Sequence, residues 1–201
     1  MREPPATDES ITGEDWYGED IGGRAWERTA LRDVDLTETT STSGLTFTDC
    51  VFREVRFNVS AHAGAAFANC YFASCSFFDA SFTDAKFLGS TFERCTFDRL
   101  TVRGGDWSFV TLAGADLRKA SFEDVRMREA DLTGARCDGA KLRRIDLSGA
   151  SLGRASFERC DLRGSDLSSL DPLSMPLRGA IITWDQAGVL AATLGLDVRV
   201  E

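Results

Sequence analysis

The sequence repeats itself every five residues over most of its length. Counting in steps of five from Phe47 to Leu167 visits 25 positions, of which twelve are Phe and eight are Leu. The other five of these marked positions hold His62, Val102, Trp107, Met127 and Cys137. A helix would rotate the marked residue by about 140° per repeat, and a strand would move it to the opposite face. Each repeat must therefore contain its own bend.

The residue two positions before each marked residue is small. Side chains of an extended segment alternate between its two faces, so this residue should point inward together with the marked one. From Leu45 to Ser165 these positions hold mostly small side chains, among them ten Ala, five Cys, three Ser and three Val. Glycine recurs two positions after the marked residue, for example at Gly64 and Gly114, where a sharp turn is needed. One large and one small inward residue per repeat would fill a narrow tube.

Three segments carry the pattern A-(D/N)-L-x-x: Ala115-Asp116-Leu117-Arg118-Lys119, Ala130-Asp131-Leu132-Thr133-Gly134 and Ser165-Asp166-Leu167-Ser168-Ser169. On these residues the chain resembles the pentapeptide-repeat family, over about three quarters of its length. The resemblance implies an all-β fold, a right-handed quadrilateral β-helix with one repeat on each of four sides. Residues 20 apart would then stack in one column.

The rhythm is shifted by one residue before Phe47, so the stretch 37–44 must absorb an extra residue. Inward positions in the first part hold Glu14, Glu19 and Arg24, which are poor occupants of a tube interior. We therefore expect a tail and an irregular cap over 1–28 and a β-helix over 29–182. An end of the tube needs a cover, because it exposes apolar side chains and unpaired strand edges. The expected lids at this end are Trp16, Tyr17 and Trp26.

The rhythm fades near the end of the chain, and a different element is expected over 183–201. Thr183 is a suitable N-cap for a helix from Trp184 to about Leu194, and the alternating residues 196–201 favour a short strand. One face of this helix carries an apolar stripe, Ala187, Leu190, Ala191 and Leu194. The segment is either a simple cap on the β-helix or a dimer interface built on that cap.

The cysteines and the histidine all fall on inward positions. The six cysteines therefore indicate small core residues with free thiols. Stacking of Cys50 with Cys70, and of Cys75 with Cys95, leaves disulfides open. The single histidine, His62, is interpreted as a buried core residue. Metal-ligand spacing is absent from the sequence, so we expect no metal and no cofactor.

Charge and composition narrow the classes of function. The formal net charge is −9, with −7 in residues 1–44, zero in 45–179 and −2 in the remainder. Such a chain is not expected to bind nucleic acid directly. No long apolar segment or targeting pattern is present, which predicts a cytoplasmic protein without membrane contact. No catalytic constellation is found, and Arg103-Gly104-Gly105-Asp106 is interpreted as a corner, so we do not expect an enzyme.

One set of polar residues stands out in the second half of the repeats. Seven aspartates share the outward position immediately before the marked residue: Asp106, Asp116, Asp131, Asp146, Asp161, Asp166 and Asp171. Carboxylates on a rigid rod can imitate the phosphates of a duplex for a DNA-binding protein. Aspartate at this position also belongs to the family consensus, and Arg126 and Arg144 interrupt the acidic surface. Mimicry of DNA and a purely structural role therefore both stay open.

A narrower resemblance concerns the two ends of the chain. The segments Tyr17–Ile21 and Trp26–Leu36, and the ending Leu170–Leu196, are similar to the gyrase-protecting members of the family, the MfpA, Qnr and AlbG type. The unbroken register leaves no room for projecting loops, as in the MfpA type. This resemblance implies a homodimeric rod, joined through its C-terminal helix, that imitates DNA and binds DNA gyrase. It would protect this type II topoisomerase from fluoroquinolones or other poisons and so give antibiotic resistance. The alternative is a β-helical scaffold for another protein.

Overall fold

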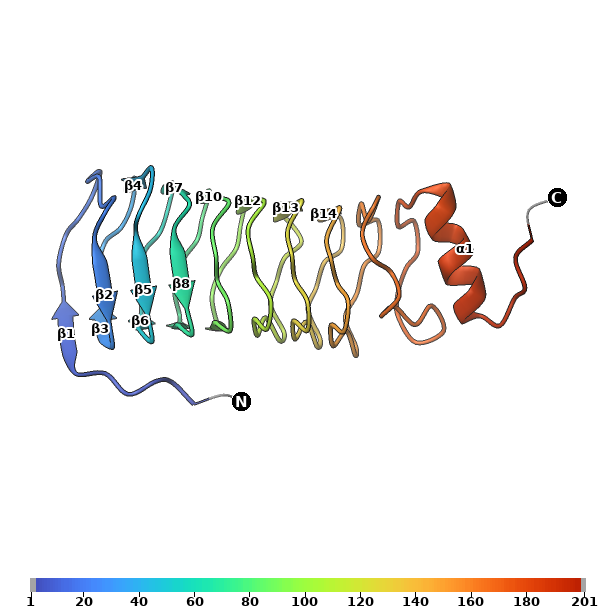
Figure 1. The fold of residues 1–201 in the computed structure, drawn as a ribbon, viewed down its shortest axis with the longest axis horizontal. Helices are drawn as coiled ribbons and strands as arrows, with labels where there is room; N and C mark the ends of the chain where they lie inside the picture. Colours follow the sequence, from blue (N-terminus) through green and yellow to red (C-terminus); the bar gives the residue numbers. More distant parts are fainter. Residues whose placement is uncertain (1–2, 200–201) are drawn as a thin grey trace.

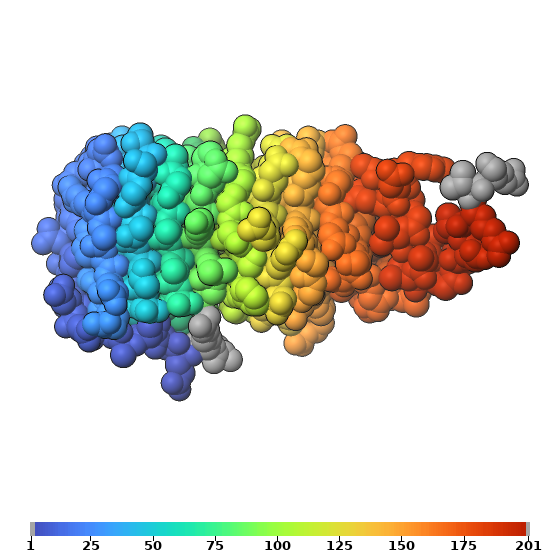
Figure 2. Space-filling view, viewed as in Figure 1, coloured from blue at the N-terminus to red at the C-terminus, as the bar shows by residue number. Residues whose placement is uncertain are grey.

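The computed structural model describes residues 3–199 and has the form of a rod (Figure 1). Coils stack in chain order along the long axis, from β1 at one end to the single labelled helix at the other. In the space-filling view each coil forms a slab across the rod, so the colours follow one another as bands (Figure 2). The expected fold class, an all-β quadrilateral β-helix with a short helical cap, is confirmed.

Short parallel strands form three of the four sides of the rod. One sheet contains β1 (Glu9–Thr12), β3 (Thr29–Arg32), β6 (Val51–Arg53), β9 (Tyr71–Ala73) and β11 (Thr91–Glu93). A second contains β4 (Thr40–Ser41), β7 (Ala61–Ala63), β10 (Ser81–Thr83), β12 (Thr101–Arg103), β13 (Ser121–Glu123) and β14 (Lys141–Arg143). The third contains β2 (Ala25–Glu27), β5 (Thr46–Thr48) and β8 (Ala66–Ala68). The fourth side is built from isolated bridges such as Arg56 to Ser76.

The marked residues form the core along the axis of the rod. Rings of successive coils stack face to face, with centroids 4.6 Å apart for Phe52 and Phe72 and 4.5 Å apart for Phe67 and Phe87. Small inward residues such as Ala85 and Ala135 are fully buried inside the tube. The large and small inward positions predicted from the sequence therefore fill the tube as expected.

The regular ladder begins earlier than the sequence suggested. β1 pairs with β3 in register, with Ile11 opposite Leu31, so coils start at Glu9 and the irregular cap expected through residue 28 is not seen. The charged inward residues are tolerated because a terminal coil has a neighbour on one side only. Glu19 and Arg24 form an ion pair of 2.8 Å at this open end, and the Arg24 guanidinium lies 5.9 Å from the centroid of the Trp16 ring.

Two further expectations for this end have different outcomes. Asp20 pairs with Thr40, which is 20 residues later in the chain. Trp26 pairs with Phe47, which is 21 residues later. The extra residue thus lies within the stretch predicted to absorb it. Trp16 is buried and stacks on Trp26, but Tyr17 is 56% exposed and does not act as a lid.

Helix α1 (Trp184–Thr193) covers the other end of the tube. Thr183 caps it, and the Gln186 side chain completes a reciprocal capping box with Thr183. The Gln186 amide is buried and donates to the carbonyl oxygens of Leu162 and Ser165, at 2.8 and 2.7 Å. Within residues 3–199 no helix is long and apolar enough to cross a bilayer.

The strand expected after the helix is absent from residues 196–199, and the last two residues of that prediction lie outside the described part of the chain. The reason is topological. The segment leaves the rod beyond α1, where the end of the ladder is already covered by the helix (Figure 1).

Candidate partner-binding surface

The seven predicted aspartates lie on the later coils, each just before a turn of the chain. Each one accepts a hydrogen bond from the backbone N–H two residues further on. Asp131, for example, accepts from Thr133 at 2.9 Å, and Asp171 accepts from Leu173 at 3.0 Å. Such side-chain bonds fix a turn by mimicking a backbone bond. The family consensus at this position therefore has a structural basis, whatever else the carboxylates do.

Arginines neutralise four of the seven. Asp106 pairs with Arg126 at 2.9 Å, and Asp146 pairs with Arg128 at 2.5 Å. Asp116 is held by Arg118 and Arg136, each at 2.7 Å. The hydrogen bond from Arg118 lowers the pKa of Asp116. These carboxylates are ionised, but their charge is offset beside them, which reduces their likeness to phosphates.

Asp161 is the fourth, and it differs most from the expectation of an outward carboxylate. It is 7% exposed and lies between Arg143 and Arg163. Hydrogen bonds from Arg163, then from Arg143, hold the pKa of Asp161 far below its ordinary value despite its burial. It is therefore an internal brace and presents no free charge to a partner.

The partners of these aspartates follow a spacing that the sequence contains. Arg126 and Arg136 lie 20 residues after Asp106 and Asp116, one coil further along the rod. Arg128 and Arg143 lie 18 residues before Asp146 and Asp161. Searching for opposite charges at these two separations would have found the ion pairs.

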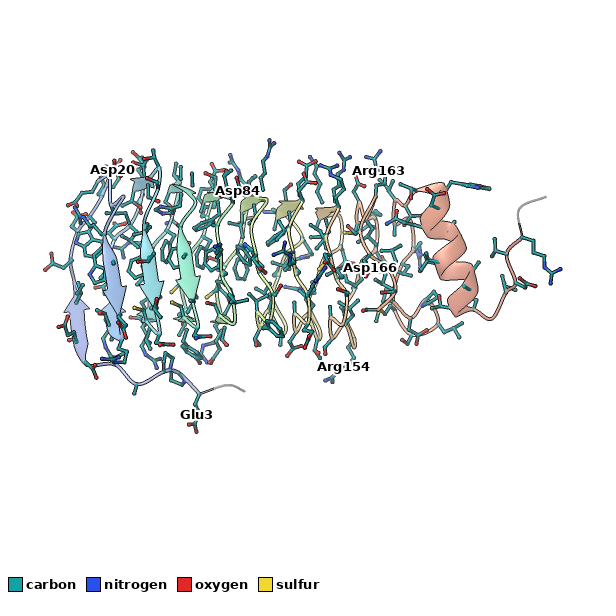
Figure 3. All side chains as sticks on the ribbon, in the orientation of Figure 1. Glu3, Asp20, Asp84, Arg154, Arg163 and Asp166 are labelled. Carbon is teal, nitrogen blue, oxygen red and sulfur yellow. The ribbon has the colours of Figure 1, made fainter. Side chains whose placement is uncertain are left out.

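Three of the seven remain without an ion pair among residues 3–199, and we call them the C-terminal carboxylates: Asp131, Asp166 and Asp171. Asp166 is labelled in Figure 3 on the part of the rod next to α1. Asp131 is the bridge partner of Ser151 on the next coil, and Asp171 lies a further 20 residues along the chain. The candidate surface is thereby concentrated near the helical end.

The first coils carry a second acidic group that the selection of the seven aspartates did not include. Asp15 and Asp35 are bridge partners on neighbouring coils, and Asp20 lies on the same first coil at the end of the rod (Figure 3). Of these, Asp35 pairs with Arg56 at 3.1 Å. Asp15 and Asp20 make no ion pair within the described chain. In the sequence, the net charge of −7 in residues 1–44 indicates this acidic group.

The predicted dimer stripe faces the rod more than it faces solvent. Leu190 packs against the hydrophobic core, Ala187 and Ala191 are half-buried, and Leu194 is 45% exposed. The reason is that Gln186 ties this side of α1 to the last coil. Several large apolar side chains are open to solvent at this end, Leu194 of the stripe among them, and we call them the end patch: Leu173, Trp184, Leu194, Leu196 and Val198. Trp184 is 92% exposed.

The remaining chemically versatile side chains lie inside the tube. His62 is buried, its Nδ1 is 2.9 Å from the Ser41 hydroxyl, and burial lowers its pKa to about 4. All six cysteines are free thiols, and burial raises the pKa of Cys160 to about 12. No group of three potential metal ligands occurs among residues 3–199. His62 and five of the cysteines are buried, and Cys95 is half-buried, so these groups are largely held away from solvent.

Coil geometry, corner aspartates and a stacked aromatic axis define the class of this protein as a right-handed β-helical rod. Its sequence matches the family description "Pentapeptide repeat region" over residues 75–152 and "Pentapeptide repeats (8 copies)" over residues 140–171. Residues 75–171 therefore carry the repeats of the pentapeptide-repeat family. No curated protein matches it.

Among solved structures, the rod is similar to two trypsin-treated variants of QnrB1, described as a plasmid-mediated fluoroquinolone resistance protein. The first is 18% identical with a TM-score of 0.61, over 97% of this chain and 99% of the QnrB1 chain. The second is 20% identical with a TM-score of 0.54, over 97% and 100% of the two chains. At this level of identity the likeness is one of fold.

Proposed function

We propose that this chain is a non-catalytic protein that binds DNA gyrase in place of DNA and protects the enzyme from topoisomerase poisons. The observation that carries the proposal is the fold likeness to QnrB1, a fluoroquinolone resistance protein, over 97% of the chain. The outward carboxylates at both ends of a rigid rod support it. The proposal includes a homodimer, a cytoplasmic location and a mode of contact like that of the loop-free MfpA type.

The charge of the rod sets limits on how such a contact works. A duplex carries about one negative charge per 1.7 Å of axis, and a coil rises about 4.8 Å, so a duplex would present about three charges per coil. Residues 45–179 of this chain balance to zero. Binding must therefore depend on a few unpaired carboxylates, and we expect a weaker salt dependence than for DNA itself.

The test is a gyrase supercoiling and DNA-cleavage assay with a fluoroquinolone present. We expect a molar excess of the protein to reduce drug-induced cleavage. Replacing the C-terminal carboxylates together, as Asp131→Asn, Asp166→Asn and Asp171→Asn, should weaken this effect at least tenfold. Asparagine keeps the oxygen that holds each corner, so only the charge is removed.

The matched control is Asp106→Asn with Asp116→Asn, which removes carboxylates already offset by arginine. We expect this control to protect gyrase as well as the parent protein does. The proposal is wrong if a large excess of the parent protein changes neither drug-induced DNA cleavage nor supercoiling by gyrase.

A second candidate is a β-helical scaffold for a partner other than gyrase. The observation in its favour is that arginines neutralise Asp106, Asp116, Asp146 and Asp161. A rod with these internal ion pairs is suited to a partner that recognises shape. An inactive result in the gyrase assay, with a protein that is folded by circular dichroism, favours this candidate.

A further inference from the structure

Two arginines stand directly opposite each other on the sheet of the first coils. Arg32 of β3 and Arg53 of β6 are Cα partners in a parallel pair. Neighbouring strands are about 4.8 Å apart, and like charges opposite each other destabilise a sheet. Neither arginine makes an ion pair within residues 3–199, whereas the nearby Arg28 and Arg56 pair with Asp8 and Asp35 at 2.6 and 3.1 Å. This basic pair therefore has no ion-pair partner in the described part of an acidic chain.

A third arginine completes a depression at this place. Arg32, Arg53 and Arg94 line a notch of about 270 Å³ together with Glu54, Ala73 and Ser74. We call it the arginine notch. Ala73 follows Arg53 in the same ladder, so a methyl group stands where a longer side chain would fill the space. With three arginines and one glutamate, the lining has a net charge of +2.

The surrounding side chains hold the notch in shape. The guanidinium of Arg53 lies 5.9 Å from the centroid of the Tyr71 ring. Tyr71 is 6% exposed, packs in a small apolar cluster on the outer side of the sheet, and donates its hydroxyl hydrogen bond to Glu93. Glu93 in turn forms an ion pair with Arg94, which positions the third guanidinium. Such restriction lowers the entropy lost when a ligand binds.

We propose that the arginine notch binds a phosphate-type oxyanion, either as free phosphate or as the phosphoryl group of a larger molecule. Guanidinium groups match phosphate oxygens through paired N–H donors. A tetrahedral dianion can accept from three guanidiniums at once, and its charge removes the repulsion between Arg32 and Arg53. The site lies on β3, β6 and β9, away from the C-terminal carboxylates, and does not depend on the gyrase proposal.

The experiment titrates the full chain with sodium phosphate and, in a second arm, with adenosine 5′-monophosphate, both at ionic strength fixed with NaCl. Two-dimensional NMR follows the backbone amides of Ala73 and Ser74, and thermal unfolding gives a second readout. We expect saturable shifts of these amides and a rise in the unfolding temperature with phosphate. Equal affinity in the two arms identifies free phosphate as sufficient. Binding at least tenfold tighter to the monophosphate identifies a phosphorylated molecule.

Variants separate the site from a general salt effect. Arg32→Gln with Arg53→Gln should abolish the saturable shifts, and in NaCl alone this variant should unfold at the same or a higher temperature, since the repulsion is gone. Arg103→Gln is the matched control, because Arg103 occupies the same outward position on β12 and is exposed without an ion pair in the described chain. We expect it to bind like the parent. Shifts that follow ionic strength alone, or saturation that survives in the double variant, would overturn the proposal.

Discussion

At the scale of single residues, the chain accepts a buried histidine in a column of aromatic rings. The centroids of the His62 and Phe82 rings are 5.4 Å apart. The Nε2 atom of His62 has no hydrogen-bond partner among residues 3–199. Burial lowers the pKa of His62 to about 4. An unfolded histidine titrates near a pKa of about 6.5. The two states of the chain therefore bind protons differently in the interval between these values.

We predict that His62 makes the protein sensitive to mild acid. Above about pH 6.5 the side chain is neutral in both states and adds no pH dependence. Between about pH 6.5 and 4 the unfolded chain binds a proton that the folded chain refuses, so the free energy of unfolding falls as pH falls. The loss reaches about 3 kcal/mol below pH 4.

His62→Phe tests this assignment, because phenylalanine is the usual occupant of the marked position. Urea unfolding of both proteins at several pH values between 7 and 4 should show a difference that grows towards low pH. Titration of the carboxylates is common to both proteins and cancels in that difference. If the two plots of unfolding free energy against pH are parallel, His62 takes up a proton as readily in the folded state as in the unfolded state.

A side chain at Gly105 would clash with the backbone of the neighbouring coil. It occupies an inward position with φ of +90°, and a Cβ there would lie 2.0 Å from the Ala85 carbonyl oxygen. We predict that Gly105→Ala destabilises the rod by several kcal/mol, because the contact is with backbone that cannot move aside. Gly114→Ala is the control: φ is +69°, but a Cβ there meets nothing within 4 Å. Its cost should stay at about 1 to 2 kcal/mol in thermal or urea unfolding. Equal costs would show that only the backbone angle matters.

At the scale of elements, helix α1 contacts the rod through the buried Gln186 amide and through Leu190, which packs against the core. Gln186 accepts from the Thr183 N–H at 2.7 Å and donates to two carbonyls of the last coil. The sequence predicted this helix and its cap correctly, because capping residues act locally. The apolar stripe left open whether α1 covers the rod or joins a second chain, and in the structure Leu190 of that stripe packs against the rod. The buried amide of Gln186 is a polar contact that the apolar pattern does not indicate.

We predict opposite effects for two substitutions in α1. Gln186→Ala removes the capping partner and leaves the buried Ser165 carbonyl without a donor, at a cost of about 1 to 3 kcal/mol, whereas the Leu162 carbonyl still accepts from the Ser165 N–H. Gly188→Ala should stabilise the helix by about 0.5 to 1 kcal/mol, since a Cβ there meets nothing within 4 Å. Hydrogen exchange of residues 184–193 measures both effects. Unchanged exchange in Gln186→Ala would show that the helix is held by its apolar contacts instead.

At the scale of the whole molecule, the five-residue period and the family resemblance together predicted the fold. The period requires a bend and an inward pair in each repeat, and the four-sided coil implied by the resemblance then places Phe52 on Phe72 and Phe72 on Phe92. Surface chemistry was less predictable. Whether an aspartate is free or paired depends on how far an arginine reaches across a coil, as between Arg143 and Asp161. The five-residue period predicts the column in which each residue lies. It does not predict the side-chain rotamer, which decides whether two charges meet.

The same distinction applies to self-association. The stripe chosen from the helical pattern includes Leu190, which packs against the core of its own chain. A charge at that position would disturb folding and could not report on a dimer. The end patch offers a sharper test, because Trp184 is 92% exposed and Leu194 is 45% exposed.

We predict that the parent protein is a dimer in sedimentation velocity at micromolar concentration, and that Trp184→Glu and Leu194→Glu are folded monomers. A carboxylate in a joined apolar end would be desolvated without a partner, which costs several kcal/mol and shifts the equilibrium by orders of magnitude. Leu88→Glu is the matched control, since Leu88 is 43% exposed but lies on the side of the rod. It should leave the dimer intact. If both end-patch variants still sediment as dimers, the chains are joined elsewhere, and monomers formed by Leu88→Glu would point to the side of the rod.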